Sequence, residues 1–85
     1  MVTTQLENEP AIEWLKLARK RFSFPKNIIK MNYQADVDLL VIRFSDKPSV
    51  RGNLDYDSGV IFNYDNESNI VSVEVLDLYG IYAAA

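Results

Sequence analysis

The hydrophobic pattern of the chain changes its period once, near Ile28, and this change constrains the fold more than any other feature. Before it, apolar residues recur with the 3.6-residue spacing of an amphipathic helix. After it, they alternate with polar residues, as along half-buried strands. A chain of 85 residues builds a single core. The sequence therefore predicts one α+β domain, in which an N-terminal amphipathic helix packs on a four- to five-stranded antiparallel β-meander.

The helix is expected over residues 9–23. Pro10 favours a start there, because proline suits the first turn of a helix, and Pro25 follows its end. Residues 1–8 are expected to form a flexible polar tail. The apolar face of the helix comprises Ala11, Ile12, Trp14, Leu15, Ala18 and Phe22, with Glu13, Lys16 and Lys20 opposite. Trp14 is expected in the core, with an interface anchor as its functional alternative.

The alternating stretch of residues 28–77 predicts strands joined by short turns, which force antiparallel neighbours. Residues 39–44 are apolar on both sides near their start, which is typical of an internal strand. Residues 50–54 are interrupted by Gly52 and indicate an edge strand. Gly59 is available for a positive φ in the next turn. Residues 78–85 form a C-terminal segment that is apolar enough to pack on the domain.

The chain contains no cysteine and no histidine. This excludes disulfides and cysteine-ligated metals, and it removes the commonest general base and the usual transition-metal ligand. Ser45, Ser58 and Ser72 have no histidine to activate them. We therefore expect no catalytic residues and no cofactor.

Acidic residues recur in the expected turns. The spacing Asp55-x-Asp57-x-Gly59 resembles the start of a calcium loop, but the later acidic ligands of such a loop do not follow. Aspartates also hydrogen-bond their own turns, which accounts for their positions. A carboxylate pair serving as acid and base would need a cleft, for which a small sheet under one helix leaves little room. We therefore expect neither a metal site nor a hydrolytic one.

Three strands occur in a characteristic order. Tyr33 precedes Asp36-Val37-Asp38 and the strand Leu39–Ser45; the strands Gly59–Asp65 and Ile70–Asp77 follow. This order resembles the small bacterial domain-of-unknown-function 2283 family. Asn63 stands where that family often has aspartate, and Ser72 stands where it often has glycine. The resemblance implies a compact antiparallel sheet and no established catalysis. It also implies an antitoxin-like role, because members often resemble the smaller half of two-gene modules whose partner looks like a RelE-type toxin.

Charge is distributed unevenly along the chain. Residues 1–30 carry a formal charge of +3 and residues 31–85 carry −6. The basic residues Lys16, Arg19, Lys20, Lys26 and Lys30 could contact nucleic-acid phosphates. A solvated helix face explains them more simply, because the chain as a whole is acidic. A nucleic-acid-associated module is thus the alternative function, and a cytoplasmic location without a membrane partner is expected, since no apolar run reaches the length of a membrane span.

One helix can cover only one face of the sheet. Apolar residues on the other face are then left to bind a protein partner or a second copy of the chain. The residues expected on this interface are Leu39, Val41, Arg43, Ile61 and Ile70. The sequence therefore predicts a protein-binding domain that binds a partner protein or forms a homo-oligomer, and whose acidic sheet half would face a basic protein.

Overall fold

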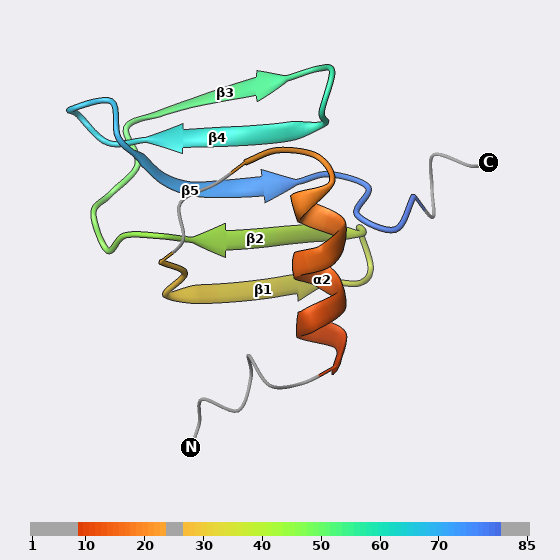
Figure 1. Cartoon of the computed structure of the whole chain (residues 1–85). Coiled ribbons are helices and arrows are strands. Elements are labelled where there is room, and N and C mark those ends of the chain that lie inside the picture. The colour runs from red at the N-terminus through yellow and green to blue at the C-terminus, as the bar shows by residue number, and fades with distance from the viewer. Residues whose placement is uncertain (1–8, 24–26, 81–85) are drawn as a thin grey trace.

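A computed structural model describes residues 9–23 and 27–80 of the chain (Figure 1). The expected tail of residues 1–8, the basic residue Lys26 and residues 81–85 lie outside the described residues. The elements are α2 (Glu9–Arg19), β1 (Lys30–Gln34), β2 (Leu39–Arg43), β3 (Arg51–Asp55), β4 (Val60–Tyr64) and β5 (Ile70–Val75). One helix and one antiparallel sheet confirm the α+β prediction.

The sheet has the strand order β1-β2-β5-β4-β3, and every neighbouring pair is antiparallel. β3, β4 and β5 form a meander, β2 is internal and β3 is an edge, as expected. β5 then returns beside β2, so the loop of residues 44–50 passes the ends of β5 and β4. Its seven residues can reach about 24 Å when extended. Three strand spacings need only about 14 Å, so this arrangement is within reach of the loop.

Helix α2 lies across β5, β2 and β1 on one face of the sheet (Figure 1). Its small residues Ala11 and Ala18 are buried, which lets the helix approach the strands closely. Trp14 packs on Tyr33 and Phe22 on Phe62, each with ring centroids 5.5 Å apart. The buried cluster on this face comprises Ala11, Ala18, Met31, Leu40, Ile42, Val60, Val73, Val75 and Leu78. The expected helix stripe and the alternation of the strands thus meet in one core.

Three local expectations differ from the structure. The helix ends at Arg19, because Lys20 and Arg21 donate to carbonyls three residues back and tighten the last turn. Ile12 is 44% exposed, since it lies about 100° around the helix from Ala11 and points past the sheet. The sheet begins at Lys30 and not at residue 28, and Ile29, which precedes β1, is 52% exposed.

Candidate functional site

The face of the sheet opposite α2 carries the side chains that alternate with the core residues. We call it the uncovered face, because no helix or strand described between residues 9 and 80 packs on it. Val41, Glu74 and Ile61 are register partners across its centre. Leu54 continues this row on β3, and all four residues are half-buried. The remaining positions of the face are Lys30, Asn32, Gln34, Leu39, Arg43, Gly52, Asn63 and Ser72.

Polar side chains in the middle of the uncovered face are bonded to each other. The Nδ2 of Asn63 donates to the Oγ of Ser72 at 3.1 Å and to the Oε2 of Glu74 at 3.0 Å. Ser72 is 5% exposed, so its hydroxyl needs this partner. Glu74 is therefore held against the sheet between the two aliphatic residues Val41 and Ile61.

One end of the uncovered face is basic. Lys30 and Arg43 are register partners on β1 and β2. Together with Asn32, Gln34 and Val41 they line a hollow of about 190 Å³. The Arg43 guanidinium also donates to the carbonyl of Lys47 at 2.9 Å. Two cations and two amides around an aliphatic floor form a site suited to a carboxylate.

Of the residues predicted for the partner interface, Leu39, Val41, Arg43 and Ile61 share the uncovered face. Ile70 does not, because it packs against the core cluster on the helix side. The cause is a register shift between Asn63 and Tyr64, which pairs Ile70 with Tyr64. Leu54 was missed, although its alternation with Gly52 in the edge strand could have placed it on this face.

The predicted basic patch is divided. Lys16 and Arg19 on α2 and Lys20 directly after it are exposed, whereas Lys30 lies on the opposite face of the sheet. Arg21, which follows the helix, has a structural role instead. Its Nη1 donates to the carbonyls of Ser58 and Leu76 at 3.1 and 2.8 Å, and its Nη2 donates to that of Asp77.

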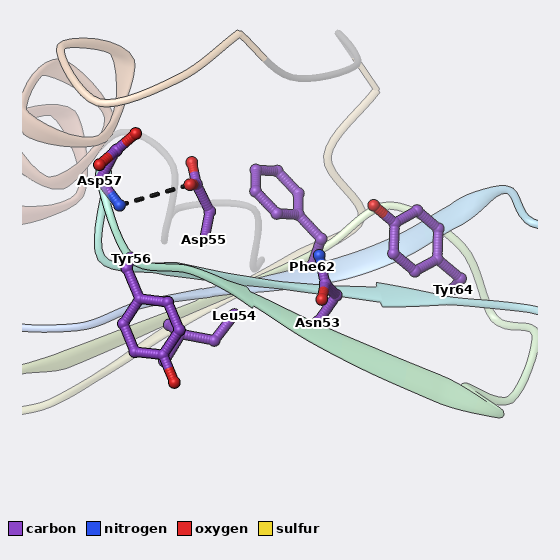
Figure 2. A pocket seen from close by; sticks show the side chains of 7 residues that line it. All are labelled: Asn53, Leu54, Asp55, Tyr56, Asp57, Phe62 and Tyr64. Atoms are coloured by element: carbon purple, nitrogen blue, oxygen red, sulfur yellow. Dashed lines mark hydrogen bonds between the residues drawn. The ribbon is translucent and has the colours of Figure 1, made fainter.

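A second hollow, of about 480 Å³, lies along β3 and β4 (Figure 2). Asp55, Asp57, Phe62 and Tyr64 lie on the helix side of the sheet, whereas Leu54 and Tyr56 project to the other side (Figure 2). The Asp55 carboxylate accepts from the Oγ of Ser58 at 2.8 Å and from the backbone N–H of Asp57 at 3.4 Å. It therefore stabilises the turn. Among the described residues, no three acidic side chains come together as a metal site.

Asp38 is a buried carboxylate that ties three segments together. It has a φ of 54° and accepts from the hydroxyl of Tyr33 at 2.6 Å and from the backbone N–H of Tyr79 at 3.0 Å. The Tyr79 ring packs edge-on against Tyr33, and its hydroxyl donates to Glu13 at 3.1 Å. Burial, and then the bond to Glu13, raise the pKa of Tyr79. This arrangement docks the segment after β5 onto the helix and the β1–β2 turn.

Asp65 is a second buried carboxylate, and it organises the turn between β4 and β5. It accepts from the backbone N–H groups of Asn69 and Glu67 at 2.9 and 2.8 Å. The bond from Asn69 is the main cause of a pKa below the ordinary value of 3.8. Lys47 lies 3.9 Å away and adds a weaker attraction. The lowered pKa of Asp65 is thus explained by its hydrogen bonds within the turn.

Acid should weaken the domain partly through Asp65. Its pKa is lowered in the folded state, so its ionised form contributes stability above pH 3.8, and this contribution is lost as the pH falls through the folded pKa. We expect the free energy of unfolding to fall more steeply between about pH 4 and pH 2 in the wild type than in Asp65→Asn. Urea titrations across this range measure both slopes, and equal slopes would contradict the assignment.

The chain belongs to the family described as "Protein of unknown function (DUF2283)", which matches residues 30–78. The match covers all five strands and confirms the resemblance seen in the sequence. α2 lies outside it. No curated protein and no solved structure matches the chain. Within the residues that the structure describes, no helix could cross a bilayer.

Proposed function

We propose that this protein is a protein-binding domain whose binding surface is the uncovered face of the sheet. The observation that carries the proposal is the row of half-buried aliphatic residues Val41, Ile61 and Leu54 on a face that the helix leaves open. Burying such residues against a partner is favourable in proportion to the apolar area removed from water. An antitoxin-like neutraliser, which occludes its target by covering it, is the specific role that this surface would serve.

The partner's chemistry follows from the charges of the uncovered face. Lys30 and Arg43 form no ion pair with any residue that the structure describes, so a partner carboxylate can enter the hollow between them. Glu74 would be buried by the partner and needs a donor in addition to Asn63. We therefore propose a partner surface that is apolar at its centre, with a carboxylate facing Lys30 and Arg43 and a donor facing Glu74.

The exposed acidic residues that were expected to face a basic partner lie outside the uncovered face. The exposed Asp36, Asp57 and Asp77 lie in the turns after β1, β3 and β5, at one end of the sheet and not on the uncovered face. They would contact a basic rim of the partner and accelerate association. Added salt should therefore lower the affinity mainly by slowing association, and it should change the dissociation rate less.

The alternative of nucleic-acid binding makes a different prediction. The division of the basic residues between α2 and the far face of the sheet reduces the charge available to one duplex. A nucleic-acid binder would lose affinity for DNA or RNA steeply with salt, in proportion to the phosphates contacted. Filter binding of generic duplexes at two salt concentrations distinguishes this alternative.

The proposed surface is tested by a charge placed at its centre. We expect Val41→Asp to weaken the complex with the product of the adjacent gene at least about tenfold, because a carboxylate would be buried without a partner beside Glu74. Co-expression followed by size-exclusion chromatography with light scattering gives the complex, and calorimetry gives its dissociation constant. Ile12→Asp is the matched control, because Ile12 is an exposed aliphatic residue on the helix. A complex lost with Ile12→Asp and kept with Val41→Asp would refute the proposed surface.

A further inference from the structure

Edge strand β3 has a sequence that is complementary to itself. Its five residues, Arg51 to Asp55, place a cation at one end, an anion at the other and Asn53 at the centre. When two such strands pair antiparallel about Asn53, Arg51 of each copy lies opposite Asp55 of the other. Opposite charges that face each other across an antiparallel pair stabilise it, and like charges destabilise it. This register therefore brings together two ion pairs.

Both charged side chains lie on the side of the sheet that these contacts require, and Arg51 would swing from the Tyr64 ring to meet Asp55 of the second copy. Arg51, Asn53 and Asp55 alternate onto the helix side of the sheet, where the guanidinium lies over the ring of Tyr64 at 4.5 Å from its centroid. Asp55 points to the same side (Figure 2). Neither residue forms an ion pair with any residue described between 9 and 80. The hollow of about 480 Å³ beside Asp55 has room for the arginine of a second copy.

In the same register, the side chains on the uncovered face of the two paired strands are also complementary. Leu54 would face Gly52 of the second copy, where the missing side chain leaves space. One position further out, Tyr56 would face Val50. These are the two most exposed large apolar side chains that the structure describes, at 87% and 61%. Leu54 and Tyr56 project to the same side of the sheet (Figure 2).

The neighbouring registers lack this fit. Moving the strands by two residues in one direction places Arg51 opposite Asn53. In the other direction Asp55 faces Asn53, and the acid opposite Arg51 is Asp57, which lies in the turn beyond β3. The opposite edge, β1, is less suited because Lys30 lies on it, and lysine on an edge strand discourages pairing. Helix α2 packs over β1 through Trp14 and Tyr33, whereas β3 lies away from the helix (Figure 1).

We propose that β3 pairs antiparallel with β3 of a second copy of this chain, forming a two-fold dimer with one continuous sheet of ten strands. Paired residues of antiparallel strands point to the same side, so both helices lie on one face and both uncovered faces on the other. Five strands of five or six residues offer about 400 Å² on each uncovered face. The dimer would double this area to about 800 Å², the share that one partner contributes to a standard interface. This inference rests on the edge strand alone and does not require the proposed function.

A mixing experiment tests the register. The wild type is expected to be a dimer by sedimentation equilibrium. Arg51→Glu and Asp55→Lys should each raise its dissociation constant about tenfold or more, because each creates two like-charged pairs. An equimolar mixture of the two variants should regain dimers, since every mixed dimer has an acid opposite a base at both pairs. Circular dichroism establishes that each variant is folded.

Lys30→Glu is the matched control, because it makes the same charge change on the other edge strand. It should leave the dimer unchanged. A monomeric wild type at the concentration of an NMR sample would overturn the proposal. So would a dimer that survives Arg51→Glu, a dimer lost with Lys30→Glu, or a mixture of folded variants that stays monomeric. Should Asp55→Lys not fold, Arg51→Glu and a Tyr56→Ser variant, also expected to weaken the dimer, keep the test decisive.

Discussion

Replacing Asp38 with alanine is expected to lower the free energy of unfolding by about 3–4 kcal/mol. The change removes a buried acceptor from the hydroxyl of Tyr33 and the backbone N–H of Tyr79. Hydrogen bonds to a charged group each contribute about 1.5–3 kcal/mol, and donors left unsatisfied cost more. Alanine also tolerates the φ of 54° less well than aspartate. Urea unfolding at one low protein concentration measures the loss.

The loss would approach the whole stability of the domain, because a core of this size contributes only about 3–5 kcal/mol. A stabilising osmolyte would keep the variant measurable. Asp38→Asn is the matched control, since it keeps an acceptor and tolerates the left-handed backbone, and it should lose less than half as much. An alanine variant as stable as the wild type would show that the Asp38 contacts contribute nothing.

Replacing Arg21 with methionine should have the second largest effect, a loss of about 2–3 kcal/mol. The guanidinium joins the end of α2 to the turns after β3 and β5 by donating to the carbonyls of Ser58, Leu76 and Asp77. Methionine keeps most of the aliphatic packing but leaves these carbonyls without the donor. Thermal and urea unfolding measure the change.

Lys20→Met removes the same charge from the neighbouring exposed position and should change stability by less than about 0.5 kcal/mol. Arg21→Lys should recover only part of the loss, because an ammonium does not offer the planar fork that reaches several carbonyls. Equal effects of Arg21→Met and Lys20→Met would show that charge, and not the hydrogen bonds, is responsible.

Periodicity predicted most of the architecture. The helix stripe, the internal strand β2 and the edge strand β3 follow from local sequence, because each depends on which face of an element is apolar. The pairing of β2 with β5 does not, since it depends on where the loop of residues 44–50 leads the chain. Ile12 was wrongly assigned to the core because a short helix buries a narrower stripe than its apolar residues suggest.

The uncovered face was predictable to a similar degree. Leu39, Val41, Arg43 and Ile61 follow from alternation, whereas the placement of Ile70 required the register shift at Tyr64. The hydrogen bonds of Arg21 and of Asp38 join segments that are far apart in the sequence. Hydrophobic periodicity does not predict such contacts. Tyr33 and Asp38, two residues on which the family resemblance was based, are hydrogen-bonded to each other.

The two departures from the family pattern are also connected. Asn63 and Ser72 are register partners joined by a hydrogen bond. A serine hydroxyl buried at this position needs an acceptor or donor beside it, and the Asn63 amide supplies one. The structure therefore joins these two positions of the uncovered face by one hydrogen bond.

Methyl NMR tests the central claim most directly. The protein is labelled at isoleucine, leucine and valine methyl groups and titrated with the product of the adjacent gene. Signals of Val41 and Ile61 should shift or broaden, whereas that of Ile12 on the exposed side of α2 should stay unchanged. Binding that perturbs Ile12 and leaves Val41 and Ile61 untouched would contradict a partner site on the face of the sheet that the helix leaves open.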